Sequence, residues 1–93
     1  MIVAGVGKSV RVTGRVQGVF FRAWTAEQAE RLGVGGWVRN CPDGSVEAHF
    51  EGDAAAVEQI IGAMRRGPRG ARVDRVDVES AVPDQADRFE VRN

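Results

Sequence analysis

The chain of 93 residues has one cysteine, one histidine and no tyrosine, and its charges balance to a formal net charge of +0. Because Cys41 has no second cysteine to pair with, an internal disulfide is excluded, and a metal site built on thiolates is disfavoured. A lone cysteine also favours an intracellular, cytoplasmic location. A general nucleic-acid binder is usually more basic than this chain. We therefore expect no nucleic-acid partner.

Long hydrophobic runs are also missing. The apolar start, residues 1–7, is too short for the core of a signal peptide and far too short to span a bilayer. We therefore expect no membrane partner. A chain of this length forms one domain around one core. We expect a flexible N-terminal segment over residues 1–7 and a single domain over residues 8–93.

Two common phosphate-binding motifs are absent, because the chain has neither Gly-Lys-Ser/Thr nor the Gly-x-Gly-x-x-Gly spacing. What it does contain is a glycine-flanked loop, Gly14 to Arg22, between a strand pattern and a helix pattern. The backbone N–H groups of such a loop, together with the helix dipole, can form an anion site. Arg22 adds a planar cation that matches two phosphate oxygens. Taken alone, the loop fits better an ordinary turn whose glycines relieve backbone strain, with Arg22 as a solvated charge.

Hydrophobic periodicity predicts the remaining elements. Alternation with period two indicates strands over residues 9–16, 34–40, 45–51 and 76–82, and Phe89 and Val91 mark a short last strand. Val73 is out of phase with the fourth strand, which we therefore expect to begin after it. Helical spacing predicts one helix over residues 21–32, ended by Gly33, and a second helix that begins after Asp53 and ends at Gly67.

This order predicts an α/β (α+β) ferredoxin-like sandwich, βαββαβ with a short extra C-terminal strand. We expect an antiparallel sheet with both helices on one face. Right-handed crossovers place the first strand beside the third and leave the second on an edge. The first two strands then run in the same direction, so the loop after the first and Asn40 at the end of the second lie at one end of the sheet, roughly 10 Å apart. Arg22 and Asn40 can both reach into that gap.

Two stretches of the sequence resemble the signatures of the acylphosphatase family. Residues 12–22, which read VTGRVQGVFFR, resemble the first signature, and residues 36–40, followed by Gly44, Val46 and Gly52, resemble the second. The resemblance covers nearly the whole chain and implies the ferredoxin-like sandwich. It also implies hydrolysis of the carboxyl–phosphate bond of acyl phosphates without a metal or another cofactor. The sequence departs from the commonest pattern at Cys41, where many members carry threonine.

The resemblance also implies a site. Arg22 would bind the phosphate, and Asn40 would orient the attacking water. The backbone N–H groups of a phosphate-binding loop would complete the site, and this loop comprises Arg15, Val16, Gln17, Gly18, Val19, Phe20 and Phe21. The leaving carboxylate has a conjugate acid with a pKa of about 4, so it can depart without a general acid. We expect a small-molecule acyl phosphate as the partner and a monomeric chain.

Two alternatives stay open. The chain could be a non-catalytic module of the same fold that captures an anion such as carbamoyl phosphate. It could also be an RNA-binding ferredoxin-like domain, but that function needs stacking aromatics on the central strands, and the outward positions there hold Arg11, Thr13, Glu47 and His49. We expect a structural role for His49. We expect solvated carboxylates rather than metal ligands at Glu47, Glu51, Asp74, Asp77 and Glu79.

Overall fold

The structure is a computed structural model that describes residues 5–93. Along the chain its elements are β1 (Val6–Arg15), α1 (Phe21–Leu32), β2 (Gly35–Asn40), β3 (Val46–Gly52), α2 (Ala54–Arg66), β4 (Arg72–Ser80) and β5 (Phe89–Arg92). Of the segment 1–7 that we expected to be flexible, residues 1–4 lie outside the described residues, and β1 already begins at Val6.

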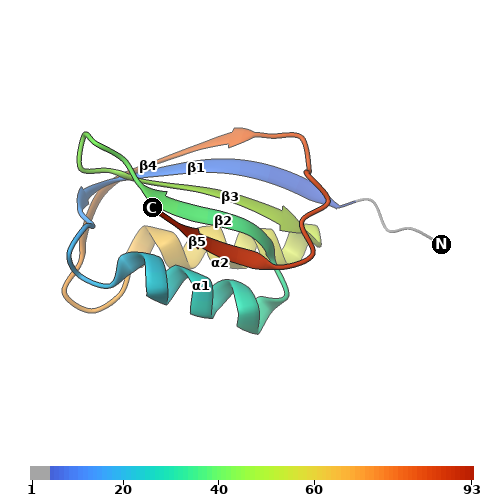
Figure 1. Ribbon diagram of the computed structural model, residues 1–93, viewed down its shortest axis with the longest axis horizontal. Coiled ribbons are helices and arrows are strands. Elements are labelled where there is room, and N and C mark those ends of the chain that lie inside the picture. Colours follow the sequence, from blue (N-terminus) through green and yellow to red (C-terminus); the bar gives the residue numbers. More distant parts are fainter. Residues whose placement is uncertain (1–4) are drawn as a thin grey trace.

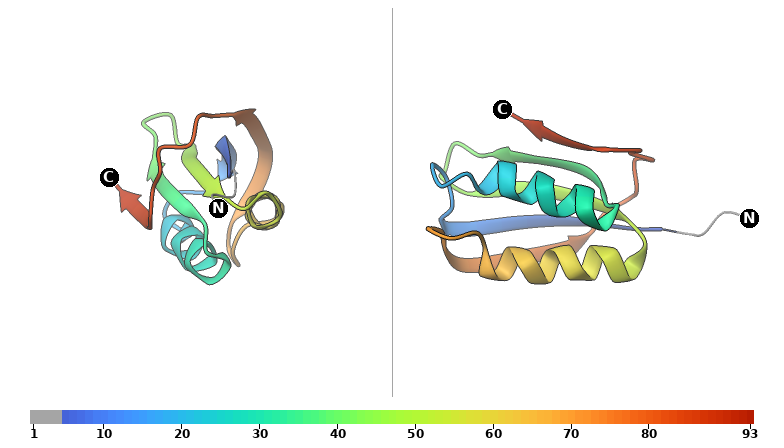
Figure 2. Two further views of the ribbon diagram at one scale, coloured as in Figure 1. Left: turned by 90° about the vertical axis from the view of Figure 1, so that its right-hand side faces the viewer. Right: turned by 90° about the horizontal axis from the view of Figure 1, so that it is seen from below.

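The five strands form one sheet in the order β4-β1-β3-β2-β5, and both helices cover the same face of it (Figures 1 and 2). This is the expected ferredoxin-like α+β sandwich, with β1 beside β3. Two details of the expectation were wrong. The sheet is mixed, because β5 pairs parallel to β2 while the other pairs are antiparallel. For the same reason β2 is not an edge strand, since β5 covers its outer side.

The fourth strand begins at Arg72, earlier than the phase of Val73 suggested. The register between β1 and β4 shifts at Thr13/Gly14, so that Gly14 pairs with Val73 whereas Val12 pairs with Val76. This β-bulge brings the two backbones very close. A Cβ on Gly14, whose φ is 135°, would lie 2.2 Å from the carbonyl oxygen of Arg72. The bulge therefore requires glycine at position 14 and accounts for the phase break at Val73.

The core lies between the sheet and the two helices. Helix α1 buries Phe21, Thr25 and Ala29, and α2 buries the expected stripe of Val57, Ile60, Ile61 and Met64. Both helices end at glycines, as the sequence predicts. None of the helices described over residues 5–93 is long and apolar enough to cross a membrane.

Candidate functional site

The loop between β1 and α1 lies at the end of the molecule where β2 and β5 also end, on the left in Figure 1. A cavity of about 320 Å³ opens there. Its lining joins the two residues that we singled out, Arg22 and Asn40, although 18 positions separate them in the sequence. The other lining residues are Val16, Gly18, Phe20, Phe21, Ala23 and Val91. Among the other loop residues that we predicted, Arg15, Gln17 and Val19 do not line this cavity.

The N-terminus of α1 faces this cavity without a side-chain cap. Phe20 holds the N-cap position in a left-handed conformation (φ 59°, ψ 27°), makes no side-chain capping bond, and is followed by no acidic residue in the first turn. Helix α2 differs, because the carboxylate of Asp53 accepts hydrogen bonds from the N–H groups of Ala55 and Ala56. The first N–H groups of a helix have no partner within it and carry the positive end of its dipole. At α1 these groups stay available to an anion.

The guanidinium of Arg22 is held from one side. Its Nη1 donates a hydrogen bond of 2.8 Å to the main-chain carbonyl of Arg92 in β5. None of the ion pairs among residues 5–93 involves Arg22, so no carboxylate there neutralises its charge. The last strand therefore orients Arg22 while leaving its positive charge for a ligand. Sequence reasoning missed this contact, because a main-chain acceptor on a four-residue strand leaves no side-chain signature.

A side chain of the loop also ties it to the turn after β2. The amide nitrogen Nε2 of Gln17 donates to the carbonyl oxygens of Cys41 at 2.9 Å and Ser45 at 2.8 Å. Cys41 directly follows Asn40, and its N–H donates to the Ser45 carbonyl at 2.8 Å. The Gln17 side chain thus fixes the distance between the loop that carries the free N–H groups and the strand end that carries Asn40.

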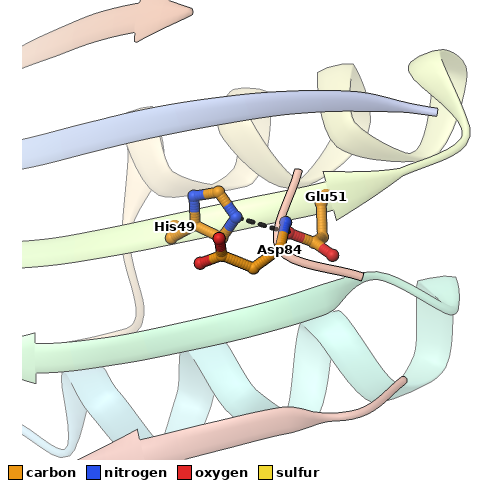
Figure 3. Close-up of side chains that lie close together, drawn as sticks. All are labelled: His49, Glu51 and Asp84. Carbon is orange, nitrogen blue, oxygen red and sulfur yellow. Dashed lines mark hydrogen bonds and ion pairs between the residues drawn. The ribbon is translucent and has the colours of Figure 1, made fainter. Parts of the chain in front are cut away.

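A second cluster of polar side chains lies on the face of the sheet that the helices do not cover. Figure 3 shows its members, His49, Glu51 and Asp84. Their potential ligand atoms lie within 4.8 Å of one another. The oxygens of Glu51 are already occupied, because they accept hydrogen bonds from His49 Nε2 at 2.6 Å and from the N–H groups of Asp84 and Ala86. The cluster therefore works as an anchor for the segment that leads into β5.

This cluster corrects one expectation. Glu51 is not a solvated carboxylate but is 5% exposed, because the segment around Asp84 folds over it. His49 is buried as well, beneath the stacked ring of Trp37. Burial opposes the ionisation of Glu51, but the hydrogen bonds from Asp84, His49 and Ala86 together hold the pKa of this carboxyl below its ordinary value of 4.5.

A larger cavity of about 650 Å³ lies at the opposite end of α1. Its charged lining is mostly acidic, with Glu30, Glu51 and Asp87 against Arg88. A phosphate group fits such surroundings less well than the smaller cavity, where Arg22 and an uncapped helix N-terminus meet. The smaller cavity is therefore the candidate site.

Comparisons with known proteins point to one family. The family model described as Acylphosphatase matches residues 8–91. A protein of Rubrobacter xylanophilus named Acylphosphatase is 58% identical over 84 residues, which cover 89% of this chain and 76% of that protein. The structure of an acylphosphatase from Coxiella burnetii is similar with a TM-score of 0.91 at 35% identity, over 95% of this chain and 93% of that one. The crystal structure of acylphosphatase from Bacillus subtilis is similar with a TM-score of 0.92 at 30% identity, and the match covers 95% of this chain and 99% of that one.

Proposed function

Because this chain belongs to the acylphosphatase family, we propose that it hydrolyses the carboxyl–phosphate bond of small acyl phosphates to a carboxylate and inorganic phosphate. One observation carries the proposal for the site. Arg22, Asn40 and the uncapped N-terminus of α1 surround a single cavity. These are the groups that phosphoryl transfer needs for holding an anion and positioning a nucleophile.

Binding rests on the anion site at the start of α1. The guanidinium nitrogens of Arg22 that do not contact Arg92 present two N–H donors to the phosphoryl oxygens. The backbone N–H groups of the loop residues that line the cavity (Val16, Gly18, Phe20 and Phe21) and of the first helical turn bind the remaining oxygens. Together these groups offset the charge that spreads over the phosphoryl oxygens in the transition state.

The attacking water is held by Asn40. The amide oxygen of Asn40 accepts a hydrogen bond from the water, which places it in line with the bond to be broken. The water oxygen bonds to phosphorus while the bond from phosphorus to the acyl oxygen breaks, and the electron pair leaves with the carboxylate. One proton of the water passes to a phosphoryl oxygen of the substrate itself. The leaving carboxylate needs no acid, since the pKa of its conjugate acid is about 4.

The proposed reaction uses no metal ion, because Arg22 and the N–H groups take the part that a cation plays at other phosphoryl-transfer sites. We also propose that residues 8–93 form the acylphosphatase-like domain and that the chain acts as a cytoplasmic monomer. The extent of the family match, residues 8–91, supports the domain limits. Sedimentation equilibrium of the full chain tests the monomer.

Phosphate release by the purified chain from benzoyl phosphate and acetyl phosphate tests the function. We expect turnover that survives dialysis against a chelator, and competitive inhibition by inorganic phosphate. Restoration of lost activity by Mg²⁺ would contradict the metal-free reaction. Tight phosphate binding without turnover would favour the anion-capturing module instead.

A further inference from the structure

Two exposed apolar side chains stand at the mouth of the candidate cavity. Among the residues that the structure describes, three large hydrophobic side chains are exposed: Phe20 at 85%, Val82 at 82% and Val91 at 50%. Phe20 and Val91 line the same cavity as Arg22 and Asn40. Apolar surface beside a charged binding group is unfavourable in water unless a ligand covers it. The pairing of both features in one cavity points to a ligand with an anionic end and an apolar end.

The backbone of Phe20 holds its ring outside the core. A left-handed conformation, here φ 59° and ψ 27°, is rare for a bulky residue and costs conformational energy. The next residue, Phe21, points inward and is 2% exposed. Two consecutive phenylalanines thus separate, one into the core and one to the cavity mouth. Strained residues of this kind concentrate at functional sites.

Val91 reaches the same mouth from β5. It pairs in register with Val38 of β2, which is fully buried on the helix-covered face of the sheet. Asn40 lies two residues beyond Val38, so Val91 and Asn40 share this face. Phe20 and Val91 therefore approach the cavity from different elements, a loop and a strand.

We propose that Phe20 and Val91 bind the acyl group of the substrate, so that the chain prefers acyl phosphates with an aromatic or branched apolar acyl group over acetyl phosphate. This inference rests on the proposed function. With the phosphoryl group held by Arg22 and the helix N-terminus, the acyl group is attached through one bridging oxygen and must lie against the cavity mouth. An aromatic ring stacks there on Phe20, whereas the methyl of an acetyl group covers little of either side chain. The cavity volume of about 320 Å³ lies within the range of small-molecule binding sites.

The test compares kcat/KM for benzoyl phosphate and acetyl phosphate in the parent and three variants. Phe20→Asn removes the ring and keeps a residue that tolerates a left-handed backbone. Val91→Ser removes apolar surface on an independent element, and Val82→Ser is the matched control at an exposed valine that does not line the cavity. We expect the benzoyl-to-acetyl ratio to fall about 3- to 10-fold in Phe20→Asn and about 2- to 5-fold in Val91→Ser. The ratio should not change in Val82→Ser.

The inhibition constant of inorganic phosphate separates this inference from the proposed function. Phosphate has no acyl group, so its inhibition constant should stay unchanged in both cavity variants. An unchanged benzoyl-to-acetyl ratio, or equal losses of kcat/KM on both substrates, would overturn the acyl site. A variant whose oligomeric state changes while the ratio does not would also overturn it, because Phe20 and Val91 would then form an interface between copies of the chain. A parent that turns over neither substrate would overturn the proposed function. If Phe20→Asn fails to fold, as judged by circular dichroism, the ratio measured for Val91→Ser decides.

Discussion

Among single residues, Arg22 supplies a specific hydrogen-bonding geometry as well as a positive charge. Its Nη1 is taken by the Arg92 carbonyl, and its remaining N–H groups form a planar fork that a phosphoryl group can accept. A lysine keeps the charge but has neither the fork nor the same reach. We therefore expect Arg22→Lys to lose nearly as much kcat/KM as Arg22→Ala, on the order of 10²–10³. Arg31→Ala, which removes an exposed arginine from the other end of α1, is the control for net charge. A lysine variant with most of the parent activity would reduce Arg22 to a local positive charge.

A substitution at Asn40 should affect the chemical step and not the binding of phosphate. Its amide is proposed to touch the water, whose alignment matters in the transition state, whereas the loop holds the phosphoryl group throughout. We expect Asn40→Ala to lower kcat on the order of 10²–10³ and to leave the inhibition constant of phosphate nearly unchanged. Parallel measurement of kcat and this constant decides between the roles. Weak phosphate binding with normal kcat would make Asn40 a phosphate ligand.

At the scale of the element, the Gln17 side chain couples the loop to the turn between β2 and β3. Gln17→Glu keeps the size of the side chain but removes both donors and faces two carbonyl oxygens with a carboxylate. The loop should then shift relative to Asn40. A misplacement of about 1 Å can cost up to about 10² in rate, so we expect kcat to fall at least about 10-fold.

The control for this prediction is Gln59→Glu, the same change at an exposed position of α2. It should leave kcat at the parent value. A Gln17→Glu variant with parental kcat and lower thermal stability would limit the tether to a structural role.

At the scale of the whole molecule, acid should weaken the fold through Glu51. Its folded-state pKa is below the ordinary value of 4.5, so the ionised carboxylate stabilises the fold above that pH, and this stabilisation is lost as pH falls through the folded pKa. Glu51→Gln removes a charged acceptor from buried donors and should cost about 1–3 kcal/mol near neutral pH. The difference in the free energy of unfolding between parent and variant should shrink below about pH 4.5.

Urea unfolding at several pH values measures this difference, with Glu79→Gln at an exposed position of β4 as the control. A difference that stays constant down to pH 3 would show that the ionisation of Glu51 does not contribute. Because Glu51 anchors the segment that leads into β5, and the Arg92 carbonyl in β5 holds Arg22, the variant should also lower kcat/KM at neutral pH.

Local interactions explain why much of this protein could be predicted from its sequence. The period-two strands, the helical stripe of α2, the caps at Asp53 and Gly33 and the turn after Asn40 depend on residues a few positions apart. The order of these elements then led to the sandwich. It also led to the meeting of Arg22 and Asn40 at one end of the sheet, since parallel strands β1 and β2 end there.

The position of the short last strand, and what this strand covers, follow from contacts between segments that are far apart in the sequence. The four residues of β5 are too few for their periodicity to indicate which strand β5 pairs with. β5 lies beside β2, and the segment that leads into β5 is anchored by the hydrogen bond from the N–H group of Asp84 to Glu51. The burial of Glu51 depends on Asp84, 33 positions away. The meeting of Phe20 and Val91 at one cavity likewise depends on β5. Sequence pattern reports interactions between near neighbours along the chain, whereas burial, the orientation of Arg22 and the apolar mouth of the cavity arise from contacts between segments that only folding brings together.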